Sequence, residues 1–80
     1  MNAFPGAGPV RTLDLRGVGC PLNYVKIRVA LDAIEEGQSL AALLDHGEPE
    51  ENVPRSADED GFSVLEIADL GDHVRVVVRR

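Results

Sequence analysis

The stretch "TLDLRGVGCPLNYVKIRVALDAIEEG" (residues 12–37) decides the fold, because its apolar residues change from the spacing of a strand to the spacing of a helix. Over residues 11–16, leucines alternate with polar residues, as in a half-buried strand. After two glycines, apolar residues recur every three or four positions, which predicts a helix over residues 21–36 that ends at Gly37. The fold therefore starts with a strand that leads directly into a helix.

The remaining sequence predicts three more strands and one more helix. "SLAALLDH" (residues 39–46) is an apolar run that fits an interior strand, expected to run parallel to the first. An acidic loop then leads to a short helix capped by Asn52, and residues 62–69 and 73–80 form a hairpin. The order βαβαββ predicts an α+β fold, a two-layer sandwich in which a mixed four-stranded sheet carries both helices on one face.

One domain is expected over residues 12–80, after a flexible Pro- and Gly-rich tail over residues 1–11. The core is predicted from apolar positions that share a face of their element. These positions are Leu13, Leu15, Ile27, Leu31, Ile34, Leu43 or Leu44, Leu65, Ile67, Val74, Val76 and Val78.

Composition excludes several classes of function. Eight Lys and Arg against fourteen Asp and Glu give a net charge of −6, with one Tyr and two Phe, so we expect no direct nucleic-acid binding. No apolar run approaches the ~20 residues of a membrane span. The single cysteine favours a reducing, cytoplasmic setting. Cys20, His46 and His73 lack the spacing of a metal site, and "GVGCPL" lacks the third glycine of a dinucleotide fingerprint, so neither metal nor cofactor is expected.

The only cysteine, Cys20, stands where the first strand gives way to the helix. If Pro21 is the first helical residue, Cys20 is the N-cap and its sulfur faces the free amides of Leu22 and Asn23. Those donors and the helix dipole favour the thiolate, which is the nucleophilic form. The alternative is that Cys20 is a small buried apolar residue.

Two polar residues follow the second predicted strand. Parallel pairing would bring Asp45 and His46 to the sheet edge that carries Cys20. A carboxylate beside a thiolate opposes its ionisation, so we expect Asp45 to support the site by contacting a partner or by holding the loop before the second helix. His46 could pair with Cys20 or be a solvated polar cap.

The stretch "LDLRGVGCPLNYVKIRVAL" resembles the opening of the TusA/SirA-like small sulfur-carrier proteins, and the resemblance extends over residues 12–80. The positions in register are Leu13, Asp14, Gly17, Cys20, Pro21 and Lys26. Such proteins have a βαβαββ sandwich similar to the C-terminal domain of the third bacterial translation initiation factor. The resemblance implies that Cys20 takes sulfane sulfur from a cysteine desulfurase as a persulfide and passes it to an acceptor protein, in some members toward tRNA thiolation.

The sequence departs from the family pattern at three places. Asn23 replaces the second proline of a Cys-Pro-x-Pro motif, His46 and Gly47 interrupt an Asp-Asp-Pro sequence, and Phe62 replaces a frequent His. These positions lie near the thiol or on faces that would meet a partner.

Two functional hypotheses follow. In the first, the chain is a sulfurtransferase without cofactor, in which Cys20 is the nucleophile and the other site residues support it. The supporting residues are Pro21, Asn23, Lys26, Asp45 and His46, and Lys26 with Arg28 would steer a partner, offset the persulfide charge or simply be solvated. In the second, the chain is a non-catalytic interaction or regulatory module that uses its acidic second helix or its hairpin to bind another protein, and Cys20 is dispensable. Thiol reactivity separates the two.

Overall fold

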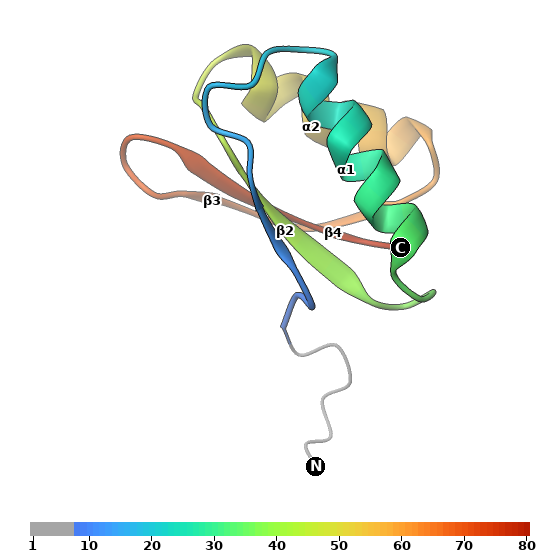
Figure 1. Ribbon diagram of the computed structural model, residues 1–80. Helices are drawn as coiled ribbons and strands as arrows, with labels where there is room; N and C mark the ends of the chain where they lie inside the picture. Colours follow the sequence, from blue (N-terminus) through green and yellow to red (C-terminus); the bar gives the residue numbers. More distant parts are fainter. Residues whose placement is uncertain (1–7) are drawn as a thin grey trace.

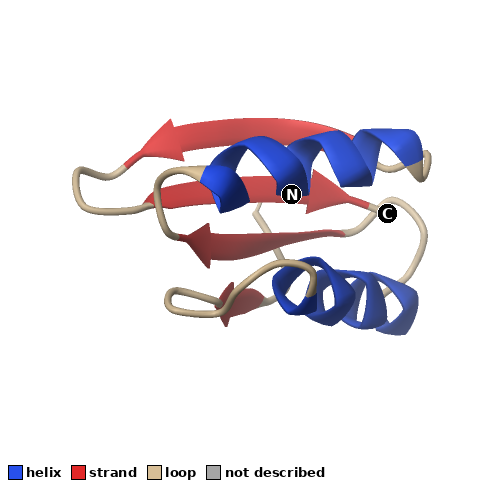
Figure 2. Cartoon of the chain, turned by 90° about the horizontal axis from the view of Figure 1, so that it is seen from above, coloured by secondary structure: helices blue, strands red, loops and turns tan. Residues whose placement is uncertain are grey.

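The computed structural model describes residues 8–80 and contains six elements in the predicted order (Figure 1). They are β1 (Thr12–Asp14), α1 (Leu22–Ala33), β2 (Ser39–Leu44), α2 (Glu48–Glu59), β3 (Ser63–Asp69) and β4 (Val74–Arg79). Both helices cover the same face of the sheet (Figure 2). The predicted α+β sandwich is therefore confirmed. Within residues 8–80, no helix combines the length and apolar character needed to cross a bilayer.

The sheet has the strand order β1-β2-β4-β3, so β1 and β3 lie at its two edges. β1 runs parallel to β2, as predicted, whereas β4 is antiparallel to both of its neighbours. Pairing begins before β1, because the Val10 amide donates to the Ser39 carbonyl at 2.8 Å and the Ala41 amide to the Arg11 carbonyl at 2.9 Å. Of the tail expected over residues 1–11, residues 1–7 lie outside the described part of the chain.

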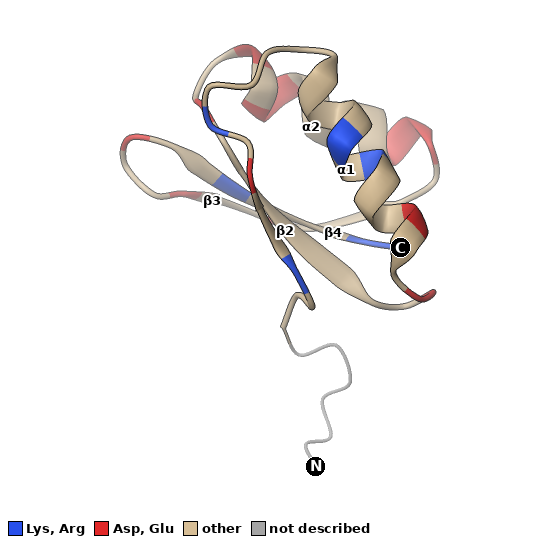
Figure 3. Ribbon diagram, in the orientation of Figure 1, with Lys and Arg blue, Asp and Glu red and all other residues tan. Residues whose placement is uncertain are grey.

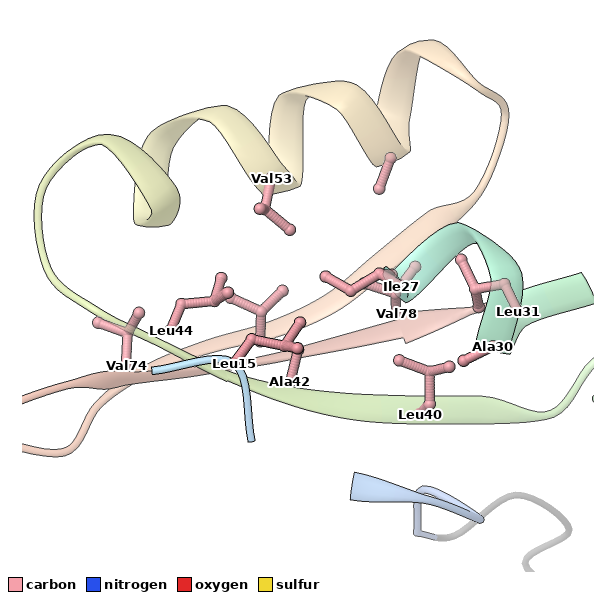
Figure 4. Packing of buried hydrophobic residues seen from close by; sticks show 12 residues of the cluster. Leu15, Ile27, Ala30, Leu31, Leu40, Ala42, Leu44, Val53, Val74 and Val78 are labelled. Atoms are coloured by element: carbon pink, nitrogen blue, oxygen red, sulfur yellow. The ribbon is translucent and has the colours of Figure 1, made fainter. Parts of the chain in front are cut away.

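The core fills the space between the sheet and the two helices (Figure 4). Alternate residues of the two central strands point toward the helices, as the register of Ala42 with Val76 and of Leu44 with Val74 requires. The fully buried apolar side chains of this layer are Ile27, Leu31, Leu40, Ala42, Leu44, Val53, Ala57, Val76 and Val78. Of the predicted pair Leu43 or Leu44, Leu44 is the core residue.

The prediction of core positions in β3 is wrong. Leu65 is 51% exposed and Ile67 is 55% exposed, whereas Val64 packs against the core. A β-bulge between Val64 and Glu66 inserts an extra residue into β3, so Val64 rather than Leu65 shares the face of the core residue Val78. Ile67 is paired with the core residue Val76, but it lies on an edge strand and remains exposed. A regular period of two residues indicates neither the insertion at Leu65 nor the position of β3 at the sheet edge, so the sequence pattern assigned the wrong residues to the core.

The predicted start of the second helix is also wrong. α2 begins at Glu48 with Gly47 as N-cap, so Asn52 lies inside the helix rather than capping it. The Gly47 amide donates to the Glu50 carboxylate at 3.3 Å, which satisfies a donor at the helix start. Pro49 is tolerated because first-turn amides need no helical partner, while Pro54 is accommodated in the interior beside the buried Val53.

Two isoleucines provide a matched test of this core. Ile27→Ala should lower the free energy of unfolding by about 2–5 kcal/mol, because Ile27 is fully buried. Ile67→Ala removes the same atoms from an exposed site and should cost less than about 1 kcal/mol. Urea unfolding of the two variants measures the difference, and equal losses would contradict the assignment of Ile67 to the surface.

Candidate functional site

Cys20 lies in the loop that joins β1 to α1, where its thiol is free and exposed. The loop follows the carboxyl end of β1, next to the end of its parallel neighbour β2 (Figure 1). The Leu15 amide donates to the Leu43 carbonyl at 2.9 Å, and the Val18 amide donates to the Leu15 carbonyl at 3.1 Å. The start of the loop is therefore attached to the sheet, and the thiol is accessible to another molecule.

The predicted N-cap role of Cys20 is wrong, because α1 begins at Leu22 and its N-cap is Pro21. The Cys20–Pro21 peptide bond is cis. The Asn23 amide, expected to face the sulfur, donates instead to the Gly19 carbonyl at 3.0 Å. Within residues 8–80 the sulfur therefore receives no hydrogen bond from the start of α1. The amides of Asn23 and Tyr24 bind oxygen acceptors of neighbouring residues instead.

Asn23 organises the start of α1 from a fully buried position. Its Oδ1 accepts a hydrogen bond from the Tyr24 amide at 2.6 Å, a donor that the N-cap Pro21 cannot satisfy because proline has no side-chain acceptor. Its Nδ2 has no partner among the described residues. The sequence contains a signal for this burial, since Asn23 precedes the core residue Ile27 by one helical turn.

Asp45 holds the loop that carries Cys20. Its Oδ2 accepts a hydrogen bond from the Gly17 amide at 2.8 Å, and Gly17 has a φ of 82°, a conformation that favours glycine. Asp45 therefore lies at the predicted sheet edge, and its carboxylate holds a backbone amide there. The carboxylate contacts the loop before α1 rather than the loop before α2, because parallel pairing places the ends of β1 and β2 together.

The imidazole of His46 faces α2 and the β3–β4 turn. Its Nδ1 lies 2.6 Å from Glu50 Oε1, its Nε2 lies 2.8 Å from the Gly71 carbonyl oxygen, and Asp69 Oδ1 lies 3.5 Å from Nε2. Acceptance by the Gly71 carbonyl and the Glu50 carboxylate raises the pKa of His46. Both ring nitrogens are thus engaged away from Cys20, so the structure forms no Cys-His hydrogen bond.

The two cations of α1 have different environments. Lys26 is exposed and lines a groove between α1 and β1. Arg28 turns toward the end of α2, where its Nη1 lies 3.2 Å from Asp60 Oδ2 and its guanidinium carbon 5.2 Å from the centre of the Phe62 ring. Of the two basic residues considered for steering a partner, only Lys26 keeps its charge free of a carboxylate within residues 8–80.

The histidines and the cysteine do not form a metal site. His73 Nδ1 contacts Asp72 Oδ1 at 2.6 Å near the β3–β4 turn, while His46 is engaged as described above. Among residues 8–80, no group of three or more His, Cys, Asp or Glu side chains is arranged to hold a metal ion. The chemistry available at this sheet edge is that of an exposed thiol on an anchored loop.

Comparison with known proteins identifies relatives over most of the chain. The family model described as sulfurtransferase TusA matches residues 11–80. A protein of Thermotoga maritima named "Putative sulfur carrier protein" is 34% identical over 61 residues, which are 76% of this chain and 77% of that protein. The protein of the same name from Archaeoglobus fulgidus is 32% identical over 60 residues, 75% of this chain and 68% of its own length. YedF of Escherichia coli K12, named likewise, is 28% identical over 90% of this chain and 94% of its own.

A solved structure has the same fold. The crystal structure of a SirA-like protein from Desulfitobacterium hafniense superposes with a TM-score of 0.75 at 21% identity, covering 86% of this chain and 95% of the other. At this identity the likeness establishes the arrangement of strands and helices.

The charge on His46 should stabilise the fold at lower pH. Its folded-state pKa is raised above the ordinary value of 6.5. The contribution is therefore fully present below about pH 6.5 and is lost as the pH rises through the raised pKa. His46→Gln, which cannot become charged, should remove this part of the pH dependence of the free energy of unfolding. Urea unfolding between about pH 5 and 9 measures it, and the same pH dependence in both proteins would contradict the role of the charge.

Proposed function

Because this chain belongs to the sulfurtransferase TusA family, we propose that it is a sulfur carrier in which Cys20 holds the transferred sulfur as a persulfide. The observation that carries the proposal is the exposure of the only cysteine on a loop anchored to the sheet. An exposed thiol can reach the sulfur of another protein, and an anchored loop presents it in one place. The absence of a second cysteine makes each transfer intermolecular.

The transfer consists of two exchanges at sulfur. The Cys20 thiolate attacks the terminal sulfur of a donor persulfide, the sulfur–sulfur bond of the donor breaks, and the donor cysteine leaves as a thiolate. Cys20 now carries the sulfane sulfur as a persulfide. An acceptor thiolate then attacks that terminal sulfur, and Cys20 is released as a thiolate. The two steps conserve electrons and require no cofactor.

The remaining residues position the thiol. Pro21 and Asn23 shape the start of α1, and Asp45 holds Gly17 of the loop. His46 attaches the segment after β2 to the β3–β4 turn. Lys26 provides a positive charge on the exposed side of α1 that can attract a partner or offset the charge of the persulfide. None of these residues exchanges sulfur itself.

The partners of this reaction are proteins. A cysteine desulfurase or another persulfide-bearing protein supplies the sulfur, and a downstream carrier removes it, with tRNA thiolation as one destination. The net charge of −6 opposes direct contact with the RNA. A free thiol persists in a reducing compartment such as the cytoplasm, which is where we place the carrier.

Intact-mass measurement tests the persulfide directly. After incubation with a cysteine desulfurase and cysteine, the chain should gain the mass of one sulfur atom and lose it on reduction. Cys20→Ser should gain none. Cys20→Ser combined with Asp58→Cys moves the thiol to an exposed site on α2 and should load far more slowly. A wild-type chain that stays unloaded and resists alkylation would instead favour the interaction module.

The anchoring role of Asp45 has its own test. Asp45→Ala removes the acceptor of the Gly17 amide and should slow the loading of Cys20 about three- to tenfold, the equivalent of one hydrogen bond. The final extent of loading should not change, because the thiol remains exposed. Asp58→Ala, which removes a carboxylate from α2, serves as the control. Equal loading rates in the two variants would show that the contact between Asp45 and Gly17 does not position the thiol.

A further inference from the structure

An apolar stripe runs along the exposed side of α1, starting two residues after Cys20. It consists of Leu22, Val25 and Val29, which are 53%, 50% and 65% exposed. Their spacing of three and four residues places them on one face of the helix. Exposed apolar side chains are ordinary when scattered, but a contiguous row beside a functional group is typical of a contact surface.

The stripe borders a groove between α1 and β1 with a volume of about 550 Å³. Leu13 of β1, Leu15 directly after β1 and Ala30 of α1 complete its apolar lining. β1 lies at the edge of the sheet, so no described strand lies on its other side. From Leu22 to Val29 the groove follows α1 for about 10 Å, the length of about three extended residues.

Two cations border this groove, Arg11 at the start of β1 and Lys26 on α1. Within residues 8–80, neither forms an ion pair or a side-chain hydrogen bond. By contrast, Arg16, Arg28 and Arg75 each lie within 3.2 Å of a carboxylate oxygen. Figure 3 shows basic residues at the start of β1, in the following loop and on α1, with an acidic residue on β1 between them; other acidic residues lie on α2, at the far end of α1 and at the β3–β4 turn.

The one carboxylate in the lining is already neutralised. Asp14 accepts hydrogen bonds from Arg16 Nε at 2.9 Å and Nη2 at 2.8 Å, and this contact lowers the pKa of Asp14 to about 2. The groove is therefore apolar with a net positive border, in a chain of net charge −6. Its complement is an apolar segment that carries carboxylates.

We propose that this groove is the docking surface for an acidic, apolar segment of the protein that exchanges sulfur with Cys20. The identity of the occupant rests on the proposed function, since a chain with one cysteine must bring a second protein to its thiol. A partner seated on Cys20 meets Leu22 next, and the stripe extends that contact toward Val29. Carboxylates of the segment would then lie between Arg11 and Lys26.

Disulfide exchange with short peptides tests the groove without using a persulfide. The chain is equilibrated, in buffer containing mercaptoethanol, with the symmetric disulfides of peptides that place Leu-Glu-Leu-Glu, Leu-Lys-Leu-Lys or Ser-Glu-Ser-Glu two glycines after a cysteine, so that the Cys20 thiolate displaces one peptide thiolate. The fraction of each mixed disulfide on Cys20 is read by intact mass. The Leu-Glu peptide should exceed the Leu-Lys peptide about tenfold, because its two carboxylates attract the exposed cations that two ammonium groups would repel.

Variants of the groove separate the contribution of its cations from the contribution of its apolar side chains. Arg11→Glu with Lys26→Glu should reverse the charge preference, and Val25→Ser with Val29→Ser should abolish the preference for leucine over serine. Arg55→Glu on α2 and Leu65→Ser on β3 are matched controls that should change neither. Equal fractions for the glutamate and lysine peptides, or a charge preference unaltered by the Arg11 and Lys26 substitutions, would overturn the proposal.

Two further outcomes are distinguishable. If sedimentation shows a dimer of the chain that Val25→Ser with Val29→Ser dissociates, the occupant is a second copy and the proposed partner is wrong. If the peptide preferences hold while a desulfurase never loads Cys20, the groove binds acidic, apolar segments as proposed and only the proposed carrier function is wrong.

Discussion

Parallel pairing of β1 with β2 is the constraint on which the site depends. Two parallel strands require a crossover, and here the crossover is α1, which packs across the sheet. The carboxyl ends of both strands consequently meet at one sheet edge. There the loop after β1 hydrogen-bonds to Leu43, and Asp45 reaches the Gly17 amide. Without this pairing, neither contact could form, and the segment that carries Cys20 would lose its attachment to the sheet.

Contacts between the helices decide which side of α1 faces outward. The Tyr24 hydroxyl donates to Asp60 Oδ2 at 2.6 Å, and Arg28 contacts the same carboxylate and the face of Phe62. These contacts attach one side of α1 to the end of α2. A second side of α1, which carries Ile27 and Leu31, is buried in the core. The remaining side of α1 is exposed beside β1, and its first residue comes two positions after Cys20. This side carries Leu22, Val25, Lys26 and Val29.

The arrangement suits the proposed role of Cys20, in which a sulfur atom is received from one protein and passed to another. The core and the hydrogen bonds of the loop lie behind Cys20, and the exposed thiol itself takes no hydrogen bond from the start of α1 within residues 8–80. The amides of Asn23 and Tyr24 at the start of α1 donate to Gly19 and Asn23 instead. A carrier of this kind needs a defined position for its sulfur more than an enclosed pocket, because each exchange partner supplies the second sulfur.

The sequence by itself determined the order of the elements, the parallel pairing of β1 with β2, and the place of Cys20 between a strand and a helix. These features follow from hydrophobic periodicity and from the handedness of crossovers, which act over short stretches of chain. It also predicted that Asp45 would lie at this edge, although not which amide it would hold.

Only the tertiary structure decided the hydrogen-bond partners and the irregularities. Asp45 is 28 residues from Gly17 and His46 is 25 from Gly71, separations that no local pattern encodes. The bulge after Val64 exposed Leu65, and Pro21 rather than Cys20 became the N-cap. For the hydrogen bonds the physical reason is that a buried or terminal polar group binds the partner that the assembled fold brings within reach, and that partner is defined only once sheet and helices have packed.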